Sequence, residues 1–152
     1  MSSKAEAGAT LHLRRTLPAP RDEVFAAWTE AARIPEWFGP AGRIAPRAEV
    51  DLRVGGRYRI EIQDGELVLS AVGRYLEIEP PERLVFTFGW EPVVHEVADI
   101  GETVVTVELR DREGSTEMTL THEGLPTEEA AQFHDFGWGA SFDRLEALAE
   151  LR

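Results

Sequence analysis

From residue 46 onward, apolar and polar side chains alternate in short runs, and this period of two constrains the fold more than any other feature. In one run Tyr58, Ile60 and Ile62 alternate with charged residues, and Phe86 and Phe88 belong to a later run of the same kind. Such alternation predicts strands that bury one face. The greater part of the chain is therefore expected to form a sheet.

Short turns join these runs. Gly55-Gly56, Asp64-Gly65, Pro80-Pro81 and Glu113-Gly114 separate successive apolar stretches. A parallel crossover needs a dozen or more residues, so consecutive strands are expected to pair antiparallel. The exception is the longer connection at residues 91–101, which we expect to form a loop near a face where a ligand could enter.

Helical periodicity flanks this stretch. Residues 11–17 predict a first strand, residues 20–31 a helix and residues 33–38 a second, short helix. Thr127, followed by two glutamates, is placed to cap a long final helix. One stripe of that helix is mainly apolar and is expected to pack on the sheet; it consists of His134, Trp138, Ser141, Phe142, Leu145, Leu148 and Ala149.

Two glycines lie inside this final helix. Gly137 and Gly139 would each cost about 0.5–1 kcal/mol relative to alanine. They therefore predict either the close approach of another element or a kink. Phe133 and Phe136 lie at the margin of the apolar stripe, where they either cover its edge or meet another molecule.

Length and composition predict one α+β domain. The chain has 152 residues, enough for a single core. Residues 1–9 are small and polar and are expected to be a disordered tail, which leaves residues 10–152 as the domain. No apolar run is long enough for a membrane span or a signal peptide, so a cytoplasmic protein is expected.

Charge and composition also exclude several classes of function. The formal net charge of −12 opposes binding to nucleic acid and to anionic membranes. Without cysteine there are no disulfides and no thiolate metal sites. His12, His95, His122 and His134 lack the spacing of zinc motifs, and Gly55-Gly56 lacks the lysine of a phosphate loop. We expect no metal and no cofactor.

Five strings in sequence order point to a known family. The strings are FAAWTEAARIPEWFGP, GGRYRIEI, GRYLEIEPPERLVFTFGWE, TVVTVELRDREGSTEMTLTHEGLP and HDFGWGASFDRLEAL. Together they resemble the START-related (SRPBCC) helix-grip superfamily, in the branch named for the activator of the heat-shock-protein-90 ATPase homologue. The resemblance extends over residues 10–151, nearly the whole chain.

This resemblance implies a Bet v 1-like fold. A curved, seven-stranded antiparallel sheet would wrap around the long C-terminal helix, with two short helices after the first strand. An apolar cavity would lie between sheet and helix. Superfamily members bind or carry small hydrophobic molecules, and some cyclise or hydrolyse them. The eukaryotic co-chaperones carry a further N-terminal domain that this sequence lacks, so binding to the chaperone is not expected.

The candidate ligand site is a set of large side chains expected to face that cavity. Each aromatic side chain of this kind buries roughly 150–250 Å², and tyrosine and tryptophan add a polar tip that can orient a ligand. The same residues could instead fill the core, and the sequence leaves both interpretations open. The predicted ligand-binding residues are Trp28, Trp37, Tyr58, Ile60, Phe86, Phe88, Trp90, His134, Trp138, Ser141 and Phe142.

Two of these residues are polar. His134 and Ser141 face the sheet, so each must contact either a ligand or a protein group. Seven residues along a helix rise by about 10 Å, which excludes a direct catalytic Ser–His contact. Arg74 lies in an apolar strand next to Gly73, and whether it points into the cavity or outward stays undecided.

Three functional hypotheses follow. The first is a protein that holds a small apolar or amphipathic molecule between sheet and helix. The second is a cyclase, hydratase or hydrolase that uses the same pocket with His134 as its acid–base group. The third is an interaction module, either co-chaperone-like or a homodimer, with Phe133, Phe136 and residues 91–101 as its contact surface.

Overall fold

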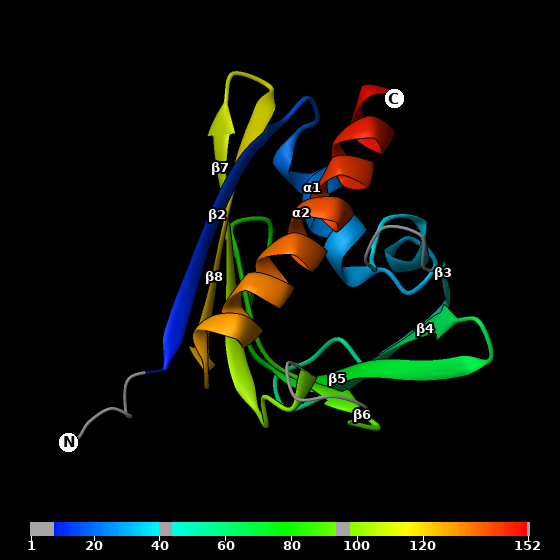
Figure 1. Cartoon of the computed structure of the whole chain (residues 1–152). Helices are drawn as coiled ribbons and strands as arrows, with labels where there is room; N and C mark the ends of the chain where they lie inside the picture. Colours follow the sequence, from blue (N-terminus) through cyan, green and yellow to red (C-terminus); the bar gives the residue numbers. More distant parts are fainter. Residues whose placement is uncertain (1–7, 40–43, 94–97, 152) are drawn as a thin grey trace.

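The predicted helix-grip architecture is confirmed. The computed structural model describes residues 8–39, 44–93 and 98–151. One antiparallel sheet of seven strands, in the order β2-β8-β7-β6-β5-β4-β3, curves around the long helix α2 (Figure 1). The elements are β2 (Ala9–Leu17), α1 (Arg21–Thr29), the 3₁₀ helix η1 (Ile34–Glu36), β3 (Ile44–Val50), β4 (Arg57–Asp64), β5 (Leu67–Glu79), β6 (Arg83–Glu91), β7 (Thr103–Arg112), β8 (Ser115–Leu125) and α2 (Glu128–Glu150).

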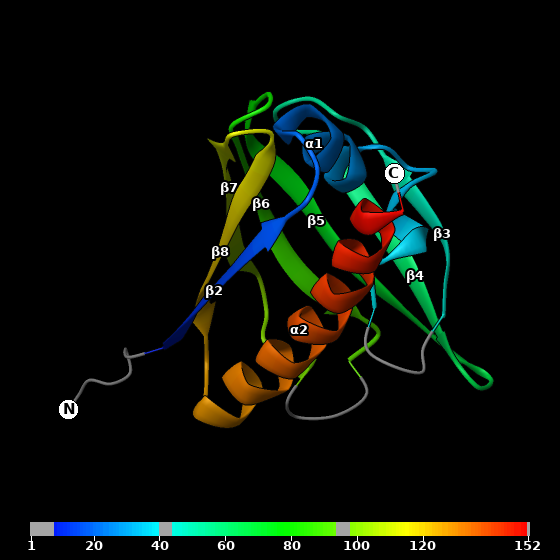
Figure 2. The same ribbon diagram turned by 90° about the horizontal axis from the view of Figure 1, so that it is seen from above.

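All three helices lie on the same side of the sheet. Figure 2, seen from above, shows α1, η1 and α2 against the inner face, with β3 to β6 beneath them. From β3 to β8, consecutive strands pair antiparallel, as the short connections predicted. At the β7–β8 turn both Glu113 and Gly114 have positive φ, 58° and 94°, which suits a tight two-residue hairpin.

Alternation places the predicted residues inside. Thr116, Met118, Leu120 and His122 are alternate buried positions along β8. Met118, Leu120 and His122 pair with the buried β7 residues Leu109, Val107 and Val105. β6 differs, because its outward side chains are also buried over much of its length. The expected first helix is shorter at both ends than residues 20–31, and the expected helix at 33–38 is a single 3₁₀ turn.

The long helix begins where its cap predicts. The Oγ1 atom of Thr127 accepts a hydrogen bond from the backbone N–H of Ala130 at 3.0 Å. The predicted close approach at Gly137 and Gly139 is wrong, because a Cβ at either position would meet no atom within 4 Å. Both glycines lie on the half-exposed flank of α2, and the helix continues through them.

Other expectations concern the ends and loops. β2 begins at Ala9, inside the segment expected as a tail, and residues 1–7 lie outside the described part of the chain. His95, with residues 94, 96 and 97 of the expected loop, also lies outside it. Within the described ranges, no helix is long and apolar enough to cross a membrane.

Candidate functional site

The space between sheet and α2 holds a continuous cluster of aromatic rings. Trp28 of α1 lies at its centre, 4.8 Å from the Trp37 ring, 5.9 Å from Trp138 and 6.1 Å from both Phe86 and Phe142, between ring centroids. These separations are those of directly packed rings. The helices and β6 thus meet through aromatic contact.

Only a small void remains within this cluster, which we call the interior pocket. Its volume is about 20 Å³, room for about one water molecule. In this structure the predicted ligand-binding residues therefore pack mainly against one another. The interior pocket is lined by Trp28, Ile34, Trp37, Phe38, Tyr58, Ile60, Tyr75, Leu84, Phe86, Phe88 and Trp138.

Sequence analysis found most of this lining. It missed Ile34 and Phe38, which a three-residue helix does not mark by periodicity, and Tyr75, whose strand changes register just after it. Leu84, on the same strand as Phe86 and Phe88, was not assigned to the site. The other four predicted residues, Trp90, His134, Ser141 and Phe142, do not line the interior pocket.

His134 is buried and bonded at both ring nitrogens. The indole N–H of Trp90 donates to Nε2 at 3.0 Å, so Nδ1 carries the proton and donates to the Ala130 carbonyl at 2.7 Å. The lone pair that a general base would use already accepts the indole proton. His134 is only 4% exposed, so the enzymatic hypothesis finds no support at its named residue.

A second histidine, not assigned to the site from sequence, is fully enclosed beside it. Trp138 donates its indole N–H to Nδ1 of His122 at 3.2 Å, and the protonated Nε2 donates to the Thr103 hydroxyl at 2.8 Å, which in turn donates to the Phe88 carbonyl. Burial, together with a smaller contribution from nearby His134, lowers the pKa of His122 to about 3. The inward alternation of β8 was the pattern that could have revealed it.

The two histidines do not form a metal site. Their rings lie 5.6 Å apart between centroids, but the acceptor nitrogen of each is taken by an indole. Across the residues that the structure places, no three His, Asp or Glu side chains converge on one point. The pair instead forms a neutral hydrogen-bonded network.

Ser141 ties α2 to the segment after η1. Its Oγ atom accepts the Gly39 N–H at 2.9 Å and lies 3.0 Å from the Gly39 carbonyl oxygen. Arg144, which sequence analysis did not single out, donates to the Trp37 carbonyl at 3.2 Å and to the Gly39 carbonyl. The structure gives Ser141 protein partners, the second of the two alternatives left open.

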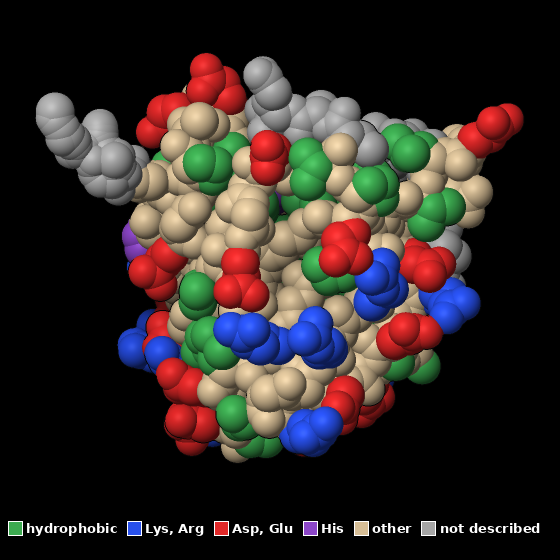
Figure 3. Space-filling model, turned by 90° about the horizontal axis from the view of Figure 1, so that it is seen from below, with side chains coloured by type: hydrophobic (Ala, Val, Ile, Leu, Met, Phe, Trp, Pro, Cys, Tyr) green, Lys and Arg blue, Asp and Glu red, His purple; other side chains and the backbone are tan. Residues whose placement is uncertain are grey.

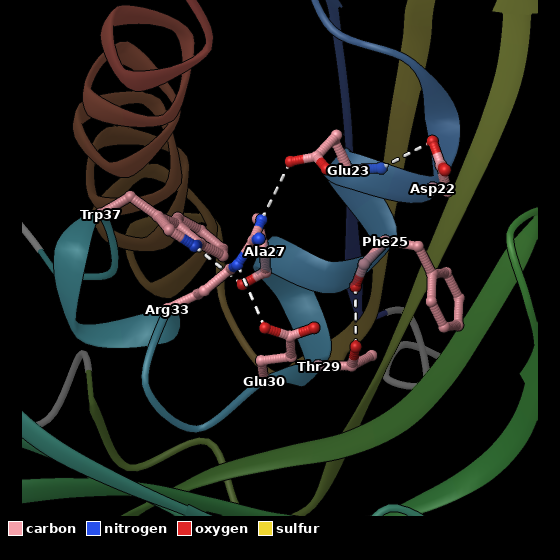
Figure 4. Close-up of polar contacts among 8 residues, drawn as sticks. All are labelled: Asp22, Glu23, Phe25, Ala27, Thr29, Glu30, Arg33 and Trp37. Atoms are coloured by element: carbon pink, nitrogen blue, oxygen red, sulfur yellow. Dashed lines mark hydrogen bonds and ion pairs between the residues drawn. The ribbon is translucent and has the colours of Figure 1, made fainter. Parts of the chain in front are cut away.

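Residues 34–39, which we call the plug, close one side of the interior pocket. Figure 4 shows how the plug is attached to α1: Trp37 donates its indole N–H to the Ala27 carbonyl at 3.0 Å. Just before the plug, Arg33 pairs with Glu23 at 3.2 Å and with Glu30 at 3.1 Å. The plug contributes Ile34, Trp37 and Phe38 to the pocket lining.

A much larger hollow than the interior pocket lies on the opposite face of the sheet. The outer groove, as we call it, has a volume of about 700 Å³ and crosses the outer sides of β4, β5 and β6. Figure 3 shows this face, where basic and acidic side chains lie around a hollowed surface. Its lining is Glu49, Val50, Asp51, Arg57, Tyr58, Arg59, Val72, Gly73, Arg74, Thr87, Gly89, Trp90, Glu91, Val93, Ala98, Asp99, Gly101 and Glu102.

The direction of Arg74 is now settled. Its side chain is about half exposed and points into the outer groove, where it lies 3.8 Å from Glu102. Phe133 and Phe136 are exposed on α2, at 39% and 68%. Their role as a contact surface stays a prediction.

Comparisons with known proteins agree with this fold. The family model described as Activator of Hsp90 ATPase homolog 1-like protein matches residues 18–150. A search of curated proteins found no match.

Solved structures align over nearly the full chain. A protein from Chromobacterium violaceum is 29% identical, with 93% of this chain and 96% of that one covered and a TM-score of 0.82. The AHSA1 protein from Silicibacter pomeroyi is 26% identical, with 94% and 99% covered and a TM-score of 0.79. CalU16 from Micromonospora echinospora is 27% identical, with 92% of this chain and 75% of that one covered and a TM-score of 0.69. The chain therefore belongs to the family of Activator of Hsp90 ATPase homolog 1-like proteins, within the helix-grip superfamily.

Proposed function

We propose that this protein binds a small apolar or amphipathic molecule between its sheet and α2, without chemical conversion. The fold is one that typically binds hydrophobic ligands. The observation that carries the proposal is the lining of the interior pocket, which consists entirely of aromatic and aliphatic residues from the sheet and all three helices. Ligand sites are mostly apolar and concave, and they form where elements meet.

Binding requires the interior pocket to enlarge, because 20 Å³ holds no organic ligand. The plug is the element best suited to move. It contains one short 3₁₀ turn. Its attachments to α2 are the hydrogen bonds from Ser141 and Arg144 and the ring contacts of Trp37 with Phe142 and of Phe38 with Trp138. Displacing it would withdraw the Trp37 and Phe38 side chains and open the pocket at its side.

This opening has a thermodynamic consequence. If the open state is a small fraction of the population, the apparent dissociation constant is the intrinsic one divided by that fraction. Affinity for an apolar ligand should therefore be weak in the unaltered protein. Any substitution that loosens the plug should tighten binding while lowering the free energy of unfolding.

Ser141→Ala tests this directly. We expect the neutral fluorescent probe N-phenyl-1-naphthylamine to bind the unaltered protein weakly. Removing the Ser141 hydroxyl, which holds Gly39, should tighten binding by roughly tenfold, because a buried hydrogen bond contributes about 1–1.5 kcal/mol. Fluorescence titration measures the dissociation constant.

Thr116→Val is the matched control. Thr116 is also buried and also donates a hydrogen bond to a backbone carbonyl, that of Ala19, at 2.7 Å, but it does not contact the plug. Its loss should destabilise the protein without tightening probe binding. Absence of binding in both the parent and Ser141→Ala proteins, or equal tightening in the two variants, would refute the proposal.

The non-catalytic part rests on the histidines. His134 and His122 each offer one acceptor nitrogen, and an indole N–H occupies it in both cases. Tyr58 is buried with its hydroxyl donating to the Thr87 carbonyl at 2.6 Å, and burial raises its phenol pKa well above the ordinary value. His122 and Tyr58 are therefore not poised to exchange a proton near neutral pH, and the acceptor nitrogen of His134 is already occupied.

A further inference from the structure

The outer groove has the size of a small-molecule site and lies across the sheet from the interior pocket. Its volume of about 700 Å³ falls within the range of roughly 300–1,000 Å³ typical of ligand sites. Gly89 helps to form it: a Cβ at this position would lie 2.7 Å from the Gly101 carbonyl oxygen. The absence of a side chain at Gly89 lets the segment around Gly101 lie against β6 and form one wall.

Two arginines face each other in this groove. Arg57 of β4 and Arg74 of β5 are direct partners in the antiparallel register, so their side chains leave the sheet on the same face. Like charges placed directly opposite are unfavourable unless a counter-charge lies nearby. In this chain, with 28 acidic residues, such a pair is conspicuous.

The neighbouring charges do not compensate this pair. Arg59, the next arginine along β4, is bonded to Glu91 at 2.6 Å. Arg74 has Glu102 no closer than 3.8 Å, and within the described ranges no carboxylate forms an ion pair with Arg57.

The remaining carboxylates of the groove are engaged or distant. Glu49 pairs with Arg47 at 2.5 Å. Asp51 lies beside Arg57, because its backbone N–H donates to the Arg57 carbonyl at 3.0 Å, but its carboxylate pairs with Arg53 at 2.9 Å. Asp99 belongs to the connection after β6, and among the described residues no ion pair joins it to Arg57 or Arg74.

Apolar surface lies beside the two arginines. Val72 is on the groove floor, opposite Gly89 in the register of β5 and β6, and Val93 borders it. A cationic pair next to an apolar floor matches a molecule with one anionic end and an apolar body. Five carboxylates also line the groove, so a polyanion would be repelled.

We propose that the outer groove is a binding site for amphipathic monocarboxylates. The carboxylate lies between Arg57 and Arg74, and the apolar body lies along Val72 toward Val93. This site is separate from the interior pocket and does not require the plug to move. The bound carboxylate supplies the counter-charge that the arginine pair lacks.

Decanoate is the test ligand and 1-decanol its neutral counterpart. We expect decanoate to bind in isothermal titration calorimetry, and Arg57→Gln and Arg74→Gln each to weaken it by roughly 10- to 100-fold, the range for a lost hydrogen bond between charged groups. Arg110→Gln is the matched control, because Arg110 is an exposed arginine of β7 outside the groove, and it should leave the dissociation constant unchanged. Decanol should bind far more weakly than decanoate.

Amide and indole NMR shifts locate the bound molecule. Decanoate should shift the backbone amides of Gly73 and Gly89 and leave the Trp28 and Trp138 indoles unmoved. Equal binding of decanol, insensitivity to both arginine substitutions, or shifts confined to the indoles would overturn the groove proposal. Failure of decanoate to bind would also overturn it. The proposal for the interior pocket is tested separately, by titration of the neutral probe into the parent and Ser141→Ala proteins.

Discussion

The two faces of β4, β5 and β6 differ in how much space their side chains leave. Toward α2, β6 presents Phe86 and Phe88, and the rings close the space to about 20 Å³. Toward the outside the same strand presents Thr87 and Gly89, and a groove of about 700 Å³ remains. Alternation along one strand thus produces both a filled core and an open surface.

This contrast shows what an aromatic-rich interior indicates. Large rings supply side-chain volume, and a fixed gap between sheet and helix becomes smaller as that volume grows. The aromatic set around Trp28 is therefore evidence for a packed interface first and for a ligand site only if the plug opens. The hollow itself occurs where glycine and valine leave room.

The largest expected effect is at the centre of the filled face. Trp28→Ala should lower the free energy of unfolding by about 3–5 kcal/mol. The Trp28 ring packs against the rings of Trp37, Phe86 and Trp138. Its indole N–H also points at the Met118 sulfur at 3.3 Å. Urea denaturation measures the change. Val72→Ala, on the groove floor, should cost well under half as much because Val72 is only half-buried. Similar losses for the two variants would contradict the contrast between the faces.

A smaller effect concerns pH and the buried histidine network. Burial lowers the pKa of His122 from its ordinary 6.5 to about 3, so the folded protein holds this ring neutral while the unfolded chain protonates it. The unfolded state then binds more protons, and stability falls as pH falls from about 6.5 toward 3. The loss is about 1.4 kcal/mol for each pH unit, or roughly 2 kcal/mol at pH 5.

His122→Gln isolates this contribution. A glutamine amide can still accept from the Trp138 indole and donate to Thr103, but it does not titrate. Urea unfolding between pH 5 and 7, above the range in which most carboxylates protonate, gives the free energy of unfolding at each pH. This free energy should depend less on pH in the variant than in the parent. Parallel pH profiles for the two proteins would show that His122 is not held neutral.

Much of the fold could be predicted because its determinants are local. A period of two marks strands, short turns force antiparallel pairing, and Thr127 marks the start of α2. The inner face of the sheet was likewise correctly identified, since Tyr58 and Phe86 meet Trp138 of α2 there. These features depend on neighbouring residues along the chain.

What could not be predicted depends on register and on three-dimensional packing. Whether rings fill or surround a space depends on the distance between α2 and the sheet, which no periodicity encodes. Arg57 and Arg74 lie 17 positions apart in sequence and become partners only through the pairing of β4 with β5. Arg74 follows Gly73, and the register of β5 with β6 shifts just after Tyr75. The side of the sheet on which Arg74 lies could therefore not be predicted from alternation.

The smallest effect distinguishes two arginines on one strand of the open face. Arg59→Gln removes a 2.6 Å ion pair with Glu91 and should lower the free energy of unfolding by about 0.2–1 kcal/mol. Arg57→Gln removes one member of the like-charged pair with Arg74 and should leave stability unchanged or raise it by a few tenths of a kcal/mol. High salt should abolish the difference, since both interactions are exposed and screened. A loss of stability in Arg57→Gln as large as that in Arg59→Gln would mean that Arg57 already has a counter-charge, and the reason for an anion in the groove would disappear.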